Sequence, residues 1–207
     1  MVNALGADLD TELMLRARAD DAHSFGELLD RNRLLVVQYL LRMVQNRAIA
    51  EELAQDVFVR IYRSRHNYEP SAKFTTWMFR IASHLALNWM RDERHERAAV
   101  RLDGARADGS GSGAARDDLP ARQLQDKSPS VEHSLVCEIR LQEIRDSIAS
   151  LPAKQRAAVL MHKYEEMEYS QIAQALECSE SAVKSLLFRA YETLRARLAH
   201  LATGAGI

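Results

Sequence analysis

The sequence predicts an all-α protein made of two small helical domains joined by a flexible linker. Only 8 of its 207 residues are Gly and 4 are Pro, and apolar residues recur at spacings of three and four over most of the chain. Residues 101–130 break this pattern, because they are rich in Gly, Ser and Asp and almost lack large apolar side chains. Such a segment cannot bury enough surface to offset its ordering entropy. Residues 10–100 and 131–200 are therefore expected to fold as two modules on a tether.

The N-terminal module is expected to contain helices at 9–22, 24–45, 48–65 and 74–96. The apolar run LLVVQYLLRMV at 34–44 predicts a core helix, since it is too short to cross a membrane and carries Gln38 and Arg42. The third helix has an apolar stripe and a mixed-charge face. The stripe consists of Leu53, Val57, Phe58 and Ile61, and the outward face of Glu51, Glu52, Gln55, Asp56 and Arg60. Mixed charge is usually a solvated face, so the pattern alone assigns this surface no partner.

The fourth helix combines an apolar side with a basic, hydrogen-bonding side. The apolar side is formed by Phe74, Trp77, Met78, Ile81, Leu85 and Trp89, and core positions are preferred for both tryptophans. The other side is formed by Thr76, Arg80, Ser83, His84, Asn88, Arg91, Arg94 and Arg97. The preceding loop, residues 65–73, adds Asn67, Tyr68, Ser71 and Lys73. Basic and hydrogen-bonding groups beside aromatic rings suit a nucleic-acid strand with unstacked bases.

The C-terminal module has the pattern of a helix-turn-helix unit, with helices expected at 131–149, 153–166, 170–176 and 180–200. Ser170 and Ser179 are expected to cap the last two helices, and the small Ala173 allows those helices to cross closely. In such motifs the second helix enters the major groove of DNA. Its outward residues would be Ser181, Lys184, Ser185, Phe188 and Arg189. Phe188 lies roughly 120° from the centre of the apolar stripe. A helical hairpin that binds another protein is the alternative interpretation.

The charge of the chain is unevenly distributed, although its net value is only −1. Residues 1–59 contain 6 basic and 10 acidic residues, whereas residues 60–101 contain 9 basic and 4 acidic ones. An acidic segment followed by a basic one can offer different surfaces to two partners.

The sequence offers no recognisable catalytic or metal site. It contains no P-loop, no Gly-x-Gly fingerprint and no His-Glu-x-x-His motif. Its seven histidines are scattered without the i, i+4 spacing of a helical metal site, and His162 is expected to be structural or on the surface. The two cysteines, Cys137 and Cys178, form no disulfide framework. We therefore expect no enzymatic activity, no metal and no cofactor, no signal peptide, and a location in the reducing cytoplasm.

Three segments together resemble a known family: AEELAQDVFVRIY, FTTWMFRIASHLALNWMRDERHER, and the stretch from LPAKQRAAVLMHKYEEMEYS through CSESAVKSLLFRAYETLRARL. In this order they are similar to the two conserved domains of bacterial RNA polymerase sigma factors of the extracytoplasmic-function group, over about residues 10–100 and 131–200. The resemblance implies that the chain binds core RNA polymerase through its largest and second-largest subunits. It also implies promoter DNA and an anti-sigma factor as partners, and promoter opening without nucleotide hydrolysis.

The resemblance assigns roles to three sets of residues. Docking on the clamp coiled coil of the largest subunit is implied for Glu52, Gln55, Asp56, Val57, Phe58 and Arg60. Reading and melting of the minus-ten element is implied for Asn67, Tyr68, Ser71, Lys73, Thr76, Arg80, Ser83, His84, Asn88, Arg91 and Arg94. Reading of the minus-thirty-five element is implied for Ser181, Lys184, Ser185, Phe188 and Arg189. The linker would thread the polymerase near the RNA exit path.

Three positions depart from the family pattern. His84 stands where many members have Asn, Glu177 where the helix-turn-helix break often has Gly, and Leu186 where several have Arg. A strained turn is therefore expected at Glu177. A competing function is a helix-turn-helix regulator that binds duplex DNA by itself, usually as a dimer. That alternative leaves residues 65–97 without a role.

Overall fold

The computed structural model describes residues 2–103 and 131–203, with side chains described for 9–96 and 137–201. These residues form eight α-helices, one short 3-10 helix and no strand, which confirms the all-α prediction. The elements are α1 Val2–Arg18, α2 Ala22–Val44, α3 Arg47–Ser64, η1 Arg65–Asn67, α4 Phe74–Asp103, α5 Val131–Ala149, α6 Ala153–Lys163, α7 Tyr169–Ala175 and α8 Glu180–Thr203. Beyond residue 103, the predicted linker lies outside the described residues.

Local side-chain caps explain why α2 and α3 begin where they do. The Asp21 carboxylate accepts hydrogen bonds from the backbone N–H groups of His23 and Ser24, at 3.0 and 3.2 Å. The Asn46 side chain accepts from the N–H of Ile49 at 3.2 Å. Both caps satisfy donors that lack a partner in the first turn of a helix. Between the two helices Gln45 adopts a left-handed conformation, with φ of 58°, and this ends α2.

Several predicted boundaries and one predicted cap were wrong. The first helix runs from Val2 to Arg18 instead of over 9–22. The fourth helix continues to Asp103 instead of ending at 96, and the sixth ends at Lys163 instead of 166. Glu168, not Ser170, occupies the cap position of α7, and the Gln171 side chain accepts a hydrogen bond from the N–H of Glu168 at 2.9 Å. Ser170 therefore lies in the first turn. The cap of α8 is as predicted, because the Ser179 hydroxyl accepts from the N–H of Ala182 at 3.2 Å.

This difference between the two serines can be measured. Ser179→Ala should lower the free energy of unfolding by about 1 kcal/mol, because the first turn of α8 loses its cap. Ser170→Ala should change it by less than about 0.5 kcal/mol, as is usual for surface positions without a special contact. Urea denaturation followed by circular dichroism gives both values. Equal losses in the two variants would contradict the cap assignment.

The core of the N-terminal module forms where α2, α3 and α4 meet. Tyr39 and Phe79 are buried with ring centroids 5.1 Å apart, and the Tyr39 hydroxyl lies 2.8 Å from the Ser83 hydroxyl. Burial of a ring such as Phe79 stabilises the fold by about 1.5–3 kcal/mol. Trp77 and Trp89 are half-buried and pack against this core, in agreement with the preference for core positions.

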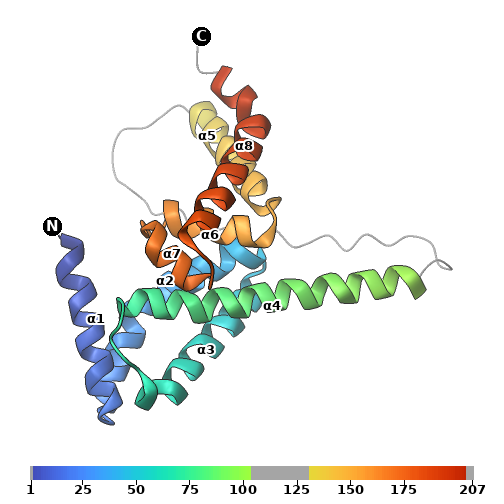
Figure 1. Cartoon of the computed structure of the whole chain (residues 1–207). Helices are drawn as coiled ribbons and strands as arrows, with labels where there is room; N and C mark the ends of the chain where they lie inside the picture. Colours follow the sequence, from blue (N-terminus) through green and yellow to red (C-terminus); the bar gives the residue numbers. More distant parts are fainter. Residues whose placement is uncertain (1, 104–130, 204–207) are drawn as a thin grey trace.

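The two modules pack against each other, so their buried side chains form one continuous cluster. Figure 1 shows α6 and α7 on one side of α4 and α3 on the other side. Two contacts of α2 with the C-terminal module involve arginines. The Arg156 guanidinium donates to the carbonyl oxygen of Met43, and the Arg42 guanidinium lies 4.2 Å from the centroid of the Tyr164 ring. The described residues of the two modules are therefore in direct contact.

Candidate nucleic-acid and polymerase interfaces

The turn between α7 and α8 sets the angle of the helix-turn-helix unit. Glu177 has a φ of 51°, in the left-handed region, and its N–H points to the carbonyl of Gln174 at 3.4 Å. The N–H of Cys178 donates to the carbonyl of Ala173 at 3.0 Å. This pair of bonds is the Schellman arrangement that ends many helices, usually with Gly at the left-handed position. The left-handed position predicted at this turn is thus present. It carries the Glu177 side chain, whereas Gly would be the least strained residue there.

The second helix of the unit separates its buried and exposed residues as the sequence predicted. Val183, Leu187 and Ala190 are at most 2% exposed and face the core. Phe188, next to Leu187 in the sequence, is 68% exposed. The residues predicted to face outward are all exposed: Ser181, Lys184, Ser185, Phe188 and Arg189. The N-terminal half of α8 therefore presents hydroxyls, two cations and one ring on a single solvent-facing surface.

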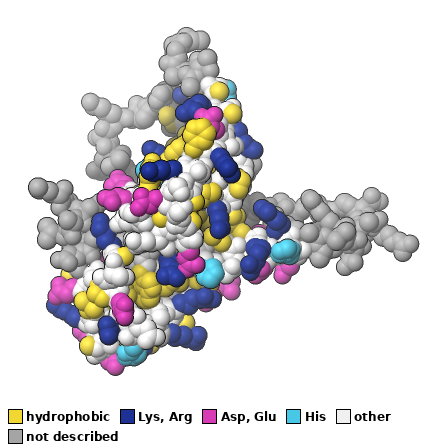
Figure 2. Space-filling view, viewed as in Figure 1, with side chains coloured by type: hydrophobic (Ala, Val, Ile, Leu, Met, Phe, Trp, Pro, Cys, Tyr) yellow, Lys and Arg dark blue, Asp and Glu magenta, His cyan; other side chains and the backbone are white. Residues whose placement is uncertain are grey.

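The predicted minus-ten face of α4 is partly corrected. Arg80, His84, Arg91 and Arg94 are exposed, and Asn88 is half-buried. Thr76 and Ser83 are only 2% and 1% exposed, so their predicted outward orientation was wrong. Ser83 turns inward because its hydroxyl pairs with Tyr39 on α2. Figure 2 shows basic side chains over the part of the surface that α4 crosses, with acidic ones next to them.

The loop before α4 is fixed by contacts with the α1–α2 connection. Arg65 forms an ion pair with Asp20 at 2.7 Å, and the Arg18 guanidinium donates to the carbonyl of Tyr68 at 2.9 Å. The hydrogen bond of Arg65 holds the pKa of the Asp20 carboxyl below its usual value. Tyr68 itself is buried, with its ring centroid 5.0 Å from that of Trp77.

Of the four loop residues implied in reading the minus-ten element, three are exposed, namely Asn67, Ser71 and Lys73. Tyr68 is corrected to a buried residue that supports the loop. Its aromatic character suggested base stacking from sequence, but the same ring can equally fill a gap between the loop and Trp77.

The predicted polymerase-docking face of α3 contains four exposed residues, Glu52, Gln55, Asp56 and Arg60. Val57 and Phe58 are 0% and 6% exposed, so they belong to the core and not to this contact surface. Their burial fixes the orientation of α3, because the apolar stripe on one side leaves the charged residues on the other. The exposed part of the predicted docking face on α3 is therefore the set Glu52, Gln55, Asp56 and Arg60.

Two contacts between the modules involve residues that the sequence did not single out for this role. The Arg80 guanidinium binds one carboxylate oxygen of Glu177, through Nε at 2.7 Å and a terminal nitrogen at 2.5 Å. Arg156 is 8% exposed and donates to carbonyls at the ends of α2 and α5. Neither pairing follows from helical periodicity, because the partners are 97 and 113 residues apart in the chain.

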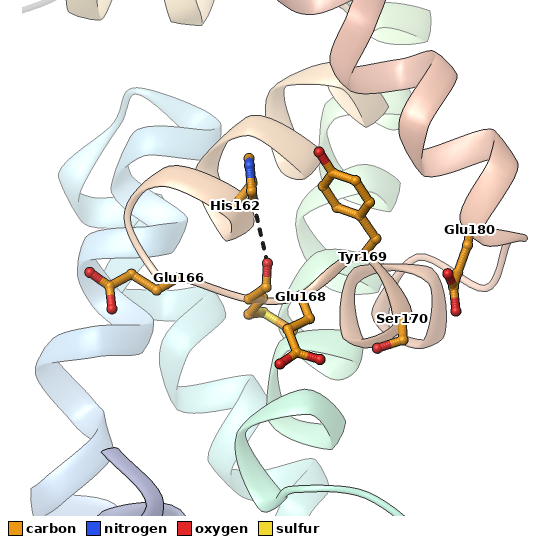
Figure 3. A pocket seen from close by; sticks show the side chains of 7 residues that line it. His162, Glu166, Glu168, Tyr169, Ser170 and Glu180 are labelled. Carbon is orange, nitrogen blue, oxygen red and sulfur yellow. Dashed lines mark hydrogen bonds between the residues drawn. The ribbon is translucent and has the colours of Figure 1, made fainter. Parts of the chain in front are cut away.

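A shallow pocket lies near the start of α7. Figure 3 shows His162, Glu168 and Tyr169 around it, with the carboxylates of Glu166 and Glu180 at its margins. The His162 ring lies 3.4 Å from the carbonyl of Met167, and this contact ties the loop back onto α6. Among the described residues no group of His, Cys, Asp and Glu could hold a metal ion.

No helix in the described ranges is both long and apolar enough to span a membrane.

The chain is similar to known proteins over most of its length. Residues 28–96 match the model of sigma-70 region 2, and residues 141–194 match that of sigma-70 region 4. The chain is 32% identical over 189 residues to the RNA polymerase sigma factor CarQ of Myxococcus xanthus, covering 91% of this chain and 97% of CarQ. The chain belongs to the extracytoplasmic-function group of RNA polymerase sigma factors. This sigma factor directs RNA polymerase to promoters for initiation of transcription.

Other relatives and solved structures agree with this assignment. The sigma factor is 27% identical to the sigma-H factor of Pseudomonas aeruginosa, over 92% of this chain and 94% of that protein. It is 25% identical to the sigma-E factor of Escherichia coli K12, over 89% and 92% of the two chains. Its fold is similar to that of CnrH in complex with the cytosolic domain of CnrY, with a TM-score of 0.63, 21% identity and coverage of 93% and 99%. It is also similar to RpoE of Bartonella quintana, in complex with the anti-sigma factor NepR, with a TM-score of 0.60, 19% identity and coverage of 84% and 96%.

Proposed function

We propose that this sigma factor uses three separate surfaces during initiation. The exposed residues of α3 bind core RNA polymerase, the loop 65–73 and α4 bind the melted minus-ten strand, and α8 reads the minus-thirty-five element. The observation that carries the proposal is the segregation of side chains on α8. A fully buried apolar stripe lies beside an exposed face that includes Lys184, Phe188 and Arg189.

On α8, the exposed side chains match what a major groove offers. Arg189 can donate two hydrogen bonds to a guanine edge, and the ring of Phe188 can pack on a thymine methyl group. Lys184 and the hydroxyls of Ser181 and Ser185 suit phosphates and base edges near the start of the helix. A helix presented by a tight turn places these groups together in one groove.

On α4, the exposed cations suit the backbone of a single strand. Arg80, Arg91 and Arg94 are exposed along the helix and are spaced to follow phosphates, while His84 and Asn88 offer hydrogen bonds. Asn67, Ser71 and Lys73 extend this surface into the loop. Because His84 stands where relatives often have Asn, we expect a changed base preference at the position it faces.

On α3, Glu52, Gln55 and Asp56 form an acidic, hydrogen-bonding face that suits a basic helical surface of the largest polymerase subunit. The C-terminal module would contact the second-largest subunit.

The sigma factor is further proposed to act in the cytoplasm, to catalyse no reaction itself and to be held inactive by an anti-sigma factor. One structural neighbour was solved in complex with the anti-sigma factor NepR, and another, CnrH, in complex with the cytosolic domain of CnrY. Similar fold alone does not identify the partner of this chain, so the partner is defined only by class.

The test is transcription from purified components. Sequencing of DNA bound by the sigma factor with core polymerase supplies candidate promoters, and each is then transcribed in vitro with and without the sigma factor. A specific transcript that requires both proteins is expected. Failure of every bound sequence to give one would refute the proposal, and tight specific binding to duplex DNA without polymerase would support a stand-alone helix-turn-helix regulator instead.

Phe188→Ala should weaken promoter binding by the holoenzyme by about 1–2 kcal/mol, or roughly 5- to 30-fold, because a base contact of α8 is lost. The free energy of unfolding should change by less than about 0.5 kcal/mol, since the side chain is 68% exposed. Filter binding and urea denaturation measure the two effects.

Ile139→Ala is the matched control for Phe188→Ala. Ile139 is an exposed apolar residue of the same module, 54% exposed on α5, and its loss should leave promoter binding unchanged. If Phe188→Ala unfolds the module instead, the assignment of Phe188 to the exposed face of α8 is wrong.

A further inference from the structure

Two residues at the end of α1 and in its connection to α2 hold the first half of the loop before α4. The Arg65 guanidinium donates to one oxygen of Asp20, through Nε at 3.3 Å and through a terminal nitrogen at 2.7 Å. Arg18, the last residue of α1, contacts the loop twice. Its guanidinium donates to the carbonyl of Tyr68 at 2.9 Å, and its own carbonyl lies 3.1 Å from Nδ1 of His66. The start of the loop is therefore fixed by residues 45 to 50 positions earlier in the chain.

The backbone at Asp20 would be least strained with glycine at that position. Its φ is 65°, in the left-handed region. The N–H of Asp20 donates to the carbonyl of Ala17 at 3.1 Å, and the N–H of Asp21 to the carbonyl of Arg16 at 3.2 Å. This pair of bonds is the Schellman arrangement, which ends α1 and involves only backbone groups. The turn is therefore complete without the Asp20 carboxylate, which binds Arg65 instead.

A second left-handed residue provides a matched comparison. Gln45, at the end of α2, has a φ of 58°. Its side chain donates to the carbonyl of Arg42 at 2.8 Å, within the same turn. The side chain of Asp20 instead reaches Arg65, at the start of η1. Asp20 and Gln45 thus share a backbone conformation and differ in whether the side chain contacts the loop.

The guanidinium of Arg65 is itself held in place by Tyr62 on α3. It donates to the carbonyl of Tyr62 at 3.0 Å, and its central carbon lies 4.1 Å from the centroid of the Tyr62 ring. The side chain of Arg65 is only 17% exposed, whereas that of Asp20 is 66% exposed. An ion pair with an ordered guanidinium loses less side-chain entropy than a pair of two mobile side chains. The contact of Asp20 with Arg65 is therefore expected to restrain η1.

These contacts meet around Asn67, an exposed residue of the loop. On one side of it, His66 lies against the carbonyl of Arg18, and on the other side Tyr68 accepts a hydrogen bond from Arg18. The ring of Tyr68 is also buried, 5.0 Å from that of Trp77. A side chain whose two backbone neighbours are held needs less ordering when it binds a ligand. It also cannot shift to restore hydrogen-bond geometry with a wrong base.

We propose that Arg18 and Asp20 are positioning residues for minus-ten recognition: they hold the loop so that Asn67 meets the base it reads at a fixed place. They act through Tyr68 and Arg65, not by contact with DNA. Loss of this restraint lowers discrimination between bases more than it lowers overall promoter binding. The inference rests on the proposed role of the loop in reading the minus-ten strand, but the restraint itself is measured without DNA.

The first test is hydrogen exchange in the full-length sigma factor. Asp20→Gly removes the carboxylate and gives the turn its least strained residue. The backbone amides of residues 66–71 should exchange about 3- to 5-fold faster, the upper range for loss of an exposed ion pair. The urea midpoint should stay equal to that of the unsubstituted chain or rise. A role of Asp20 limited to stability predicts the opposite, a lower midpoint without a local change in the loop.

The second test measures base discrimination by the holoenzyme. A promoter obtained by sequencing of bound DNA is compared with versions that carry single-base changes in the minus-ten or the minus-thirty-five element. Asp20→Gly should reduce the preference for the correct base about 3- to 5-fold at one or two minus-ten positions. Preferences in the minus-thirty-five element and affinity for core polymerase should be unchanged, because α8 and α3 keep their exposed faces.

Three further variants make the result specific. Asp20→Asn tolerates the left-handed conformation and keeps an oxygen that accepts from Arg65, so it should retain most of the restraint and of the discrimination. Arg18→Met should show both effects at least fivefold, because a charged donor to a partly buried carbonyl contributes more than an exposed ion pair. Gln45→Gly makes the same backbone change at the end of α2 and should alter neither loop exchange nor base preference.

Loop exchange in Asp20→Gly equal to that in the unsubstituted chain would overturn the proposal. Faster exchange with an unchanged minus-ten preference would also overturn it, and so would an equal loss at both promoter elements, which would indicate a general weakening of binding. A failure of the proposed function is seen separately, as an absence of promoter-specific transcripts with the unsubstituted sigma factor. The exchange measurement does not depend on that outcome.

Discussion

Replacing Asp56 by Arg is expected to weaken binding to core RNA polymerase by about 2–5 kcal/mol, a roughly 30-fold to several-thousand-fold increase in Kd. Asp56 is exposed on α3 beside Glu52 and Gln55, on the acidic face proposed to dock on polymerase. Reversal of its charge places a cation against the basic surface that this face is proposed to meet. Like charges in an interface are costly and also remove electrostatic steering of the encounter.

The fold should tolerate this change, since Val57, Phe58 and Ile61 hold α3 in the core on the opposite side. Pull-down or fluorescence titration with core polymerase measures the affinity. Glu166→Arg, an equal change of charge on an exposed residue of the other module, is the control and should bind normally. Normal affinity of Asp56→Arg would show that α3 does not dock on polymerase.

Periodicity predicted the buried face correctly on α8, which packs mainly against α5, α6 and α7 of its own module. Phe188 is the clearest case, because its position relative to Val183 and Leu187 predicted exposure, and it is 68% exposed. Periodicity did less well on α4, which packs against several helices. On α4 the sequence predicted that the polar residues Thr76 and Ser83 face outward, but both side chains are buried. Ser83 is directed inward because its hydroxyl pairs with the hydroxyl of Tyr39.

The contacts between the modules could not be derived from sequence for a different reason. A helical pattern reports which side of a helix is apolar but not which distant element covers it. Glu177 was expected only to strain a turn, and Arg80 only to face nucleic acid, yet the two residues bind each other. Likewise Ser170 and Glu168 are both plausible near a helix start, and only the observed start of α7 at Tyr169 decides between them.

Replacing Arg156 by Met is expected to lower the free energy of unfolding by about 3 kcal/mol. Arg156 is 8% exposed and donates to the carbonyls of Met43 and Ala149, in the last turn of α2 and at the end of α5. These carbonyls have no partner within their own helices and attract a cation through the helix dipole. A hydrogen bond from a charged group contributes about 1.5–3 kcal/mol, and a buried carbonyl left without one costs about 1–3 kcal/mol.

Burial lowers the pKa of Arg156 from its ordinary value, but an arginine starts so far above neutral that it stays charged in the folded protein. Arg156→Lys should therefore recover part of the loss: it keeps the charge, but a single ammonium cannot reproduce the fork that reaches both helix ends. Arg140→Met, at an exposed site on α5, is the control for the change in residue type and should be nearly neutral. Because one of the carbonyls belongs to α2, the loss in Arg156→Met should also loosen the packing between the modules. A urea midpoint equal to that of the unsubstituted chain would mean that water satisfies these carbonyls as well as Arg156 does.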